Sequence, residues 1–522
     1  MMTNDQRVAH TYEKLAADRD VYLTRARSAA ELTIPTLMPK DGHNSHSHFD
    51  TPYQSVGARG VNNLASKLLM TLLPPNAPFF RLTIDDFDLI ELAGEARGQA
   101  EEALARIERS AAQVVEAKAI RVPAFEMLKQ LIVSGNALIH MPPKGGMKVF
   151  RLDRFVVSRD TMGNLLKIVV KETIAFDALP KEVQQALIDT EGYQDTVDTK
   201  ECDLYTCVRR EGNKFLVHQE VKGIHIPKSE GSYPEDKLPW LALRFIAIDG
   251  EDYGRGFVEE YHGDLKSLES LTRAIVEGSA ASAKLLFMVR PNGTTKIRNI
   301  ADSPNGAIIS GDANDVTTLQ ANKFNDFRVA QETMQTITER LSFAFLLNSS
   351  VQRQAERVTA EEVRYMAQEL ETALGGIYSV LSQEFQLPLV NLLLNKMQKE
   401  GKMPKFPKDT LKPQIVTGLE ALGRGQDLNK LQSFLQMLAP LGQQVIAQEM
   451  NIDDYIDRLG ASLGIDTQGL IKTPEQKMEL KQQQQQQMMQ QQMMQMAEKG
   501  VPAAAKGMVE AQSAQNAQPE EE

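Results

Sequence analysis

The stretch that decides the fold is RLSFAFLLNSSVQRQAERVTAEEVRYMAQELETALGGIYSVLSQEFQLPLV, residues 340–390. It opens at the end of a predicted helix, residues 325–347, in which apolar side chains recur every three or four positions. Residues 348–358 have no apolar period, which predicts a polar loop of about ten residues. The frame is therefore a helix, a polar loop and a second helix.

The second helix of this stretch has a strong start signal. Thr359 has the position of an N-cap, and Glu362 three residues later completes a capping box. The apolar period then continues and predicts one helix over residues 359–385, which would be about 39 Å long. Gly375-Gly376 is a place where this helix can bend, and we expect the helix to stop before Pro388.

Upstream, a second amphipathic pattern pairs with the first. Residues 256–283 form a predicted helix, with apolar positions stepping by three and four from Val258 to Ile275. It ends in six consecutive small residues that would let a helix or a neighbouring chain approach closely; a frayed helix end is the alternative. These residues are Gly278, Ser279, Ala280, Ala281, Ser282 and Ala283. Between the two helices lies a predicted small module, residues 284–324. It has short strand-like pieces, such as Ala307-Ile308-Ile309, up to Leu319.

The N-terminal half divides into a helical and a β-rich part. Within the first 140 residues, helices are expected at 12–32, 56–73 and 91–119, and a further helix opens at Pro123, because Pro is tolerated in a first turn. From residue 149 the pattern changes to an antiparallel β-rich part, about residues 149–248. Its predicted strands cover 149–152, 155–157, 165–176, 204–208, 215–221 and 240–248.

The C-terminal part is again predicted to be helical, at 389–397, 428–438 and 443–459. From Lys481 the sequence becomes KQQQQQQMMQQQMMQM, a run into which a helix can extend because Gln and Met are good helix formers. The last 25 or so residues lack the apolar content to fold. The region 481–522 is therefore predicted to be partly disordered.

Composition excludes several classes of protein. The chain has 522 residues, 42% of them hydrophobic, which is ordinary globular composition at a length that needs more than one core. Its longest uncharged stretch with apolar content, 431–448, falls short of the roughly 20 residues that span a bilayer, so we expect a soluble chain without a membrane segment. Cys202 and Cys207 are expected to be free thiols in a reducing compartment. The net charge of −11 provides no global basic field to hold nucleic acid tightly.

Motifs for catalysis are missing from the sequence. It contains no GxxxxGK[ST], no GxGxxG after a strand and no HExxH, so composition and pattern favour a structural or interaction protein over an enzyme. His43, His46 and His48 have a spacing that would allow them to share a metal, but we interpret them as part of an exposed polar loop. We therefore expect no catalytic residue, no metal and no cofactor.

Two acidic pairs and one arginine have competing interpretations. The acidic pairs Asp85-Asp86 and Glu361-Glu362 stand where helix-start or solvated carboxylates are expected, and catalysis is the weaker interpretation. Arg255 between two glycines could be a phosphate or carboxylate contact, or part of a turn that starts the next helix.

Four blocks of sequence together resemble a known family. They are TPYQSVGARGVNNLASKLLMTLLPPNAPFFRL (51–82), DGEDYGRGFVEEYHGDLKSLESL (249–271), the stretch 340–390 quoted above and TGLEALGRGQDL (417–428). In this order they are similar to the head-to-tail connector, or portal, proteins of short-tailed podoviruses of the autographivirus type. The resemblance fades after Leu480.

The resemblance implies an α+β, mainly helical portal fold that forms rings. A portal subunit has a wing, a stem of two helices, a clip inserted between the stem helices, and a helical crown. On this chain the plan implies a wing at 1–255, stem helices at 256–283 and 325–347, a clip at 284–324, a tunnel loop at 348–358, a second part of the wing at 359–435, a crown at 436–480 and a tail at 481–522.

The implied function is a ring, usually of twelve copies, at one vertex of the capsid. Double-stranded DNA would pass through it during packaging and ejection, held weakly and without sequence specificity. The implied partners are the terminase large subunit, a tail adaptor protein, the major capsid and scaffolding proteins, and internal core proteins at the crown. The implied location is the virion, with the host cytoplasm during assembly.

Three groups of residues are candidates within this plan. The channel residues of the tunnel loop would be Gln352, Arg353, Gln354, Glu356 and Arg357, although Arg357 could instead pair with Glu361. The clip residues that contact terminase or adaptor would be Lys284, Arg290, Lys296 and Arg298, with a solvated basic face as the alternative. The small residues 278–283 would serve subunit packing in the stem. Two rival interpretations are a nucleic-acid-processing enzyme and a cytosolic helical scaffold without a pore.

Overall fold

The computed structural model describes most of the chain. The described residues are 7–44, 46–75, 79–83, 94–142, 145–191, 201–282, 286–319, 324–347, 360–401, 414–417, 424–442, 450, 452–463, 472 and 474–498. Contacts divide the chain into two compact units, residues 1–437 and 438–522, and each is described by itself.

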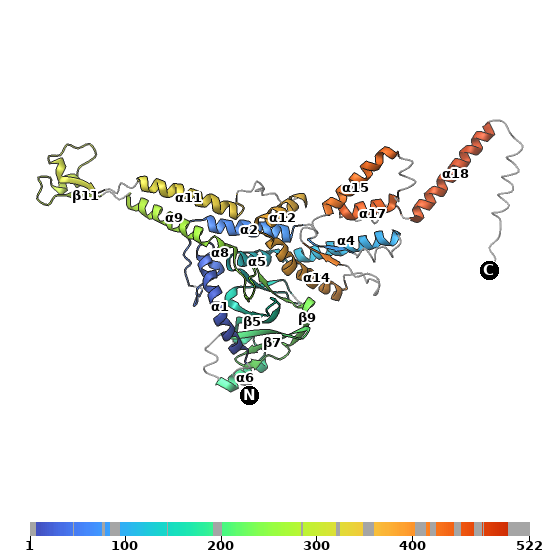
Figure 1. Cartoon of the computed structure of the whole chain (residues 1–522), viewed down its shortest axis with the longest axis horizontal. Coiled ribbons are helices and arrows are strands. Elements are labelled where there is room, and N and C mark those ends of the chain that lie inside the picture. The colour runs from blue at the N-terminus through green and yellow to red at the C-terminus, as the bar shows by residue number, and fades with distance from the viewer. Residues whose placement is uncertain are drawn as a thin grey trace. The chain divides into compact units, whose positions relative to one another are not determined.

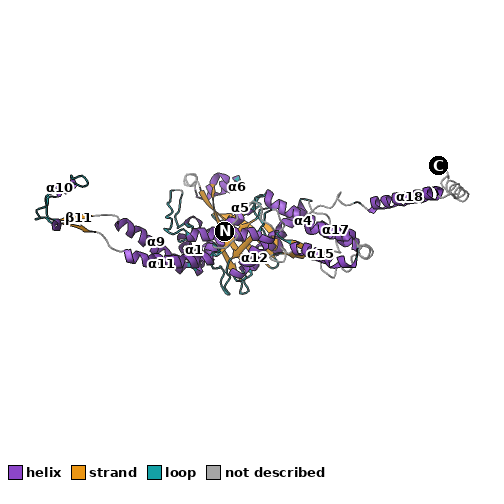
Figure 2. Cartoon of the chain, turned by 90° about the horizontal axis from the view of Figure 1, so that it is seen from above, coloured by secondary structure: helices purple, strands orange, loops and turns teal. Residues whose placement is uncertain are grey.

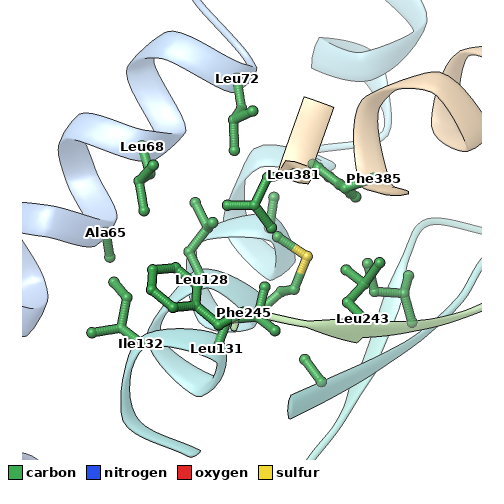
Figure 3. Packing of buried hydrophobic residues seen from close by; sticks show 14 of the residues in the cluster. Ala65, Leu68, Leu72, Leu128, Leu131, Ile132, Leu243, Phe245, Leu381 and Phe385 are labelled. Atoms are coloured by element: carbon green, nitrogen blue, oxygen red, sulfur yellow. The ribbon is translucent and has the colours of Figure 1, made fainter. Parts of the chain in front are cut away.

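The core of the first unit is built on two helices, α2 (Val56–Leu72) and α5 (Arg121–Ser134). Apolar residues at three- and four-residue spacing give α2 a buried face, with Leu64, Leu68 and Leu72 inaccessible to solvent. Figure 3 shows Leu68 and Leu72 of α2 in the same cluster as Leu128 and Leu131 of α5. The predicted helix at 56–73 is therefore confirmed, and it is the central element of the unit.

Two further helices flank this pair. Helix α1 (Val8–Glu31) contacts α5 and the β-rich part, and α4 (Gly94–Ala117) ends just before α5 begins. The buried Arg19 of α1 donates from Nη1 to the carbonyl oxygens of Leu152 and Phe155, at 3.2 and 3.0 Å. This guanidinium fastens the first helix to the β-rich part.

The β-rich part is a six-stranded antiparallel sheet, in which β4 to β8 follow chain order and β9 pairs with β7. Its strands are β4 (Phe155–Arg159), β5 (Leu165–Ala175), β6 (Glu201–Glu211), β7 (Lys214–Val221), β8 (Ile224–His225) and β9 (Gly231–Pro234). The predicted hairpin is confirmed: Asp160 accepts from the backbone N–H groups of Met162 and Asn164, and Gly163 has φ +81°. The short helix α6 (Lys181–Glu191) lies between β5 and β6 in sequence.

A second sheet corrects two expectations. Its strand order is β10-β2-β3, with β2 (Asn136–His140), β3 (Lys148–Phe150) and β10 (Trp240–Arg244). Residues 136–140 were expected within a mainly helical region, but Gly135 ends α5 in the left-handed conformation (φ +74°) and the chain turns into β2. The predicted strand 240–248 ends at Arg244 and belongs to this sheet. A two-stranded pair, β1 (Arg81–Thr83) with β13 (Gln414–Val416), completes the strands of the core.

Two long helices of the first unit run antiparallel. The predicted helix 256–283 is interrupted: a short α8 (Phe257–Glu260) is followed by α9 (His262–Ser282). Helix α11 (Phe324–Ala344) packs beside α9, as Figures 1 and 2 both show. Residues 286–319 stand between these helices in sequence, with β11 (Leu286–Val289), α10 (Ile297–Ala301) and β12 (Val316–Leu319).

The module of residues 286–319, which we call the distal module, corrects one expectation. Residues Ala307-Ile308-Ile309 form no strand, and Ile308 is fully exposed. The strand that pairs with β11 is β12, in the register Leu286 to Leu319 and Val289 to Val316.

The long predicted helix 359–385 is wrong as a single element. It divides into α12 (Ala360–Ala373), α13 (Ile377–Leu381), a π-helical turn (Ser382–Gln386) and α14 (Leu387–Lys399). Gly375 and Gly376 both have positive φ, +58° and +92°, which breaks the helix instead of bending it. The expected stop before Pro388 is also wrong. The π-helical turn leads directly into α14, and Pro388 is tolerated there because it falls in the first turn of that helix. The predicted N-cap Thr359 lies outside the described residues.

The end of the first unit and the second unit are helical where described. The elements are α15 (Arg424–Leu438), whose last residue begins the second unit, then α17 (Ile452–Leu463) and α18 (Pro474–Glu498). Residues 443–449 and 451 of the predicted helix 443–459 lie outside the described residues, and α17 covers its remaining part from Ile452. Helix α18 runs through the Gln/Met-rich stretch, and residues 499–522 lie outside the described residues.

Candidate functional site

The antiparallel pair α9–α11 is fixed at both ends. At one end, Nη2 of Arg340 donates to Oδ1 of Asp264 at 2.9 Å. At the other end, Gly278 of α9 lies against the ring of Phe327, and a Cβ at Gly278 would stand 2.9 Å from two ring carbons. Ile337 and Leu341 of α11 are buried on the inner side. The pair is therefore held by one exposed ion pair and by close packing that requires glycine.

A loop before α2 is tied to α9 by a carboxylate. Glu269 accepts from the backbone N–H groups of Tyr53 and Gln54, at 3.0 and 3.1 Å, one on each carboxylate oxygen. The guanidinium of Arg273, one turn later, lies 5.6 Å from the centre of the Tyr53 ring. These contacts link two of the sequence blocks, 51–82 and 249–271.

The C-terminal end of α11 is anchored on α2. Phe345 is completely buried and meets Phe257 edge to face, with ring centres 5.5 Å apart and planes at 87°. The side-chain amide of Asn63 donates to the carbonyl oxygens of Phe345 and Leu346, at 3.0 and 2.9 Å. Leu346 has φ +55°, so the helix stops there and the chain turns away. Asn63 therefore satisfies carbonyl groups that the end of the helix leaves free.

The helix that follows is anchored on the same α2. Nζ of Lys67 lies 3.2 Å from Oε2 of Glu369 on α12, and the Lys67 side chain is only 8% exposed. Helix α2 thus holds the chain on both sides of residues 348–359. The predicted channel residues Gln352, Arg353, Gln354, Glu356 and Arg357 lie outside the described residues.

The small residues 278–283 are brought to the end of α9. Gly278 contacts Phe327 within the chain, whereas Ser279 and Ala280 are exposed in the isolated chain. The side chains of Ala281 and Ser282, and Ala283 altogether, lie outside the described residues. The structure therefore accounts for one of the six small residues through packing inside the chain.

The distal module presents its basic residues to solvent. Arg290, Lys296 and Arg298 are all exposed, and Lys284 lies outside the described residues. Nε of Arg298 lies 3.8 Å from Oδ2 of Asp302, so part of its charge is offset locally. Arg290 directly follows β11, Lys296 precedes the first residue of α10, and Arg298 lies in α10.

A buried carboxylate organises the same module. Asp315 accepts from the backbone N–H of Thr295 and the hydroxyl of Thr294, both at 3.2 Å. Burial alone would raise the pKa of this carboxyl group, but the hydrogen bonds from both threonines bring the pKa below its ordinary value. Gly293 has no room for a side chain, because a Cβ there would lie 2.4 Å from the Asp315 carboxyl carbon.

Arg255 is engaged by carboxylates of its own chain. Its guanidinium contacts Glu251 at 2.7 and 3.1 Å and Glu259 at 2.8 Å, and the hydrogen bonds to Glu251 raise its pKa. The flanking glycines pass close to the end of α5: a Cβ at Gly256 would lie 2.5 Å from the carbonyl oxygen of Val133. The turn interpretation of Gly-Arg-Gly is therefore confirmed, and its carboxylate contacts are internal.

The remaining candidate residues form no further functional site in the described part of the chain. His43, His46 and His48 are exposed, and the described part of the chain brings no three His, Cys, Asp or Glu side chains into metal-binding distance. Asp85-Asp86 and the side chain of Glu361 lie outside the described residues. Cys202 and Cys207 are free thiols, as predicted, and both are buried. In the part of the chain with assigned structure, no helix has the length and apolar content to cross a membrane.

The anchoring residues on α2 were not predicted as functional. Asn63 and Lys67 lie within the block 51–82, one of the four blocks that carry the resemblance. Their partners are nearly 300 positions away, for example 282 between Asn63 and Phe345. No local pattern could have paired them.

Known proteins are similar in sequence to this chain over most of its length. The family model described as bacteriophage head to tail connecting protein matches residues 5–471. The chain is 45% identical over 478 residues to the portal protein of Enterobacteria phage T3, covering 90% of this chain and 89% of that one. It is 43% identical to the portal protein of Escherichia phage T7, covering 90% and 88% respectively. It is 31% identical to the portal protein of Enterobacteria phage SP6, covering 97% and 96%. The chain belongs to the family of bacteriophage head to tail connecting proteins.

Proposed function

We propose that this chain is a portal subunit, and that twelve copies form a ring at one vertex of the capsid, around a channel for double-stranded DNA. The observation that carries the proposal is the antiparallel pair α9–α11, interrupted in sequence by a small module, within a chain that matches the connector family over residues 5–471. A closed ring needs heterologous contacts, in which each copy presents one face to one neighbour and another face to the next. A subunit of this kind has a structural role, and the relatives are portal proteins.

The charge of the chain supports transit of DNA instead of tight binding. Each copy contributes −11, so a ring repels phosphates at long range. Binding by release of counterions requires a basic groove along the duplex, which such a ring does not provide. DNA would therefore slide through the channel with weak contacts that do not depend on sequence.

The segment 348–358 is proposed as the channel loop. Its supporting observation is the double anchor on α2, through Asn63 at one side and Lys67 at the other. Fixed ends would place a short polar segment at the same height in every copy. One Arg353 per copy then gives a circle of positive charge that retains packaged DNA without driving its movement.

The distal module is proposed as the docking platform for the terminase large subunit and later for a tail adaptor protein. Arg290 and Lys296 are exposed there, and the hydrogen bonds that Asp315 accepts from Thr294 and Thr295 hold the backbone near them in place. Charges of this kind steer association and select partners more than they add affinity. The helical region 436–480 is proposed to face the capsid interior and its core proteins, and major capsid and scaffolding proteins to surround the wing during assembly in the host cytoplasm.

Negative-stain imaging of the purified full-length chain tests the proposal. We expect annular particles with a central hole and a mass close to twelve chains. Non-annular particles would support the scaffold without a pore. ATP hydrolysis or nuclease turnover by the same preparation would support a nucleic-acid-processing enzyme and overturn the proposal.

A further inference from the structure

A pocket of about 360 Å³ lies in the first unit, apart from the helix pair and the distal module. It is lined by the C-terminal half of α14, by the loop that follows α4, by the turn between β2 and β3, and by β9 with the 3-10 turn Glu235–Lys237. All these elements belong to one compact unit. The proposed function makes no use of this pocket.

Much of the pocket lining is apolar, and we call this part of the lining its floor. It includes Ile120, Met141, Tyr233, Pro239 and Leu392, which come from four separate parts of the chain. Leu392 and Tyr233 are only partly buried, so apolar surface remains open to solvent within the pocket. A concave apolar surface of this size accommodates one or two large side chains of a ligand.

Basic residues also line the pocket, and we call this charged part of the lining its rim. It consists of Lys118, Lys237, Lys396 and Lys399, and Glu400 is the one carboxylate among the described lining residues. These five side chains carry a net charge of +3, in a chain with a net charge of −11. Among the residues with described structure, Lys237, Lys396 and Lys399 have no carboxylate within ion-pair distance.

Stabilisation of a helix end does not explain this charge. Lysines in the last turn of α14 interact favourably with the helix dipole, which accounts for Lys396 and Lys399. Lys237 belongs to a 3-10 turn, Lys118 belongs to the loop that follows α4, and neither lies on α14. Four cations from three parts of the chain thus line one pocket together with apolar side chains, which is the arrangement expected of a binding site for a ligand with both negative charge and apolar groups.

We propose that this pocket binds an acidic peptide segment of a partner protein, with one or two large apolar side chains seated between α14 and Tyr233 and with carboxylates facing the lysines. A peptide fits better than a small anion, because the apolar floor gains nothing from an inorganic ion. A nucleic acid fits less well, since the apolar floor is concave and Tyr233 is its one aromatic ring.

The test uses the purified full-length protein and a short fluorescein-labelled peptide of alternating Glu and Leu. We expect saturable binding by fluorescence anisotropy, weakened at least about tenfold in the double variant Lys237→Glu, Lys396→Glu, because two attractions become repulsions. Lys181→Glu on α6, an exposed lysine outside the pocket lining, is the control and should bind as the wild type does.

Two further peptides separate charge from apolar contact. A peptide with Gln in place of Glu should lose the charge-dependent part, and one with Ser in place of Leu should lose the apolar part. A peptide with one Leu replaced by photoreactive benzoylphenylalanine should cross-link to α14 or to residues 232–239, as located by mass spectrometry. Folding of each variant is checked by circular dichroism.

Three outcomes of the binding and cross-linking experiments would overturn the proposal. They are binding that ignores the lysine substitutions, binding that persists without the leucines, and cross-links outside the pocket. Binding only to unassembled chains would assign the pocket to a neighbouring copy, and would also overturn it. Imaging of the same preparation reports ring formation separately, so failure of rings and failure of peptide binding are distinguishable.

Discussion

The ring of Phe345, the residue that directly follows α11, occupies the space that a side chain at Gly60 on α2 would need. A Cβ at Gly60 would lie 2.6 Å from Cγ of Phe345, closer than real side chains approach. Because Phe345 is completely buried among Phe257 and Tyr261, it has no free space into which to move. This contact joins the helix that precedes residues 348–359 to the central helix of the core.

Gly60→Ala should therefore destabilise the protein. Overpacking costs about 1–3 kcal/mol, which exceeds the gain of up to about 1 kcal/mol in helix propensity. Chemical denaturation measures the loss in the free energy of unfolding. Gly263→Ala on α9 is the control, because nothing lies within 4 Å of a Cβ there. Equal stability of the two variants would contradict the packing argument.

Glu369→Gln should destabilise the protein, because the buried ammonium group of Lys67 loses the carboxylate that faces it. Lys67 is 8% exposed, so removal of the charge that faces it is expected to destabilise the protein by about 1–3 kcal/mol. The double variant Lys67→Met, Glu369→Leu should recover much of this loss, since it removes both charges together. A double-mutant cycle of Lys67→Met, Glu369→Leu and the variant with both substitutions, measured by chemical denaturation, gives the coupling energy. A coupling near zero would show that the pair contributes nothing.

The imidazole of His140 should titrate well below its ordinary range. Its ring lies parallel to that of Trp240, with centres 3.8 Å apart, and burial, aided by Lys148, lowers its pKa to about 4. In the unfolded chain the group takes its proton near pH 6.5, so stability is lost as the pH falls from about 6.5 to about 4, by up to about 1.4 kcal/mol per unit. The emission of Trp240, the single tryptophan, should report a midpoint near pH 4 that His140→Gln abolishes. A midpoint near pH 6.5 would contradict the burial of this imidazole.

Asp315→Asn should loosen the distal module alone. Thr294 and Thr295 both donate to Oδ2, and a neutral amide oxygen in that position accepts these hydrogen bonds less strongly than a carboxylate oxygen does. Faster limited proteolysis within residues 286–319, with unchanged ring formation, is the expected result. Asp302→Asn is the exposed control from the same module and should leave the proteolysis rate unchanged. In the wild type, the lowered pKa of Asp315 means that its stabilising contribution is lost as the pH falls below about 4.

Deletion of Gln352–Ala355 tests the proposed channel loop. Because α2 holds the chain on both sides of residues 348–359, ring assembly should persist, whereas packaged DNA should leak or stall. The measurement is the DNA content of capsids after packaging. Capsids that fill and retain DNA normally would reduce the segment to a connector.

The helices with strong local periodicity were predictable from the sequence. Residues 56–73 were expected and α2 covers Val56–Leu72, because its buried face repeats within its own sequence. Strand β2 was missed because NALIH is a short apolar run directly after a helix, and its strand character comes from pairing with β10, about a hundred residues later. The helix break at Gly375-Gly376 was underestimated, since sequence alone does not show whether glycines take positive φ.

The candidate site was predictable in its charges and not in its contacts. Arg290, Lys296 and Arg298 could be named from sequence, but their orientation depends on the hydrogen bonds that Asp315 makes across the module. The anchors Asn63 and Lys67 became visible only when residues nearly 300 positions apart were placed side by side. Their importance is a property of tertiary packing, which local patterns do not record.

The reactivity of the two cysteine thiols reports the local opening of two separate buried clusters. Cys202 and Cys207 stand on the same strand, β6, but belong to different buried clusters, one with Leu179 and Val183 and the other with Val8 and Tyr12. Thiol reagents therefore reach each sulfur only when its own side of the sheet opens, and burial further slows Cys207 by raising its pKa. Labelling rates of the unmodified chain would time the opening of the two sides separately, and any cysteine introduced at the surface would react far ahead of both.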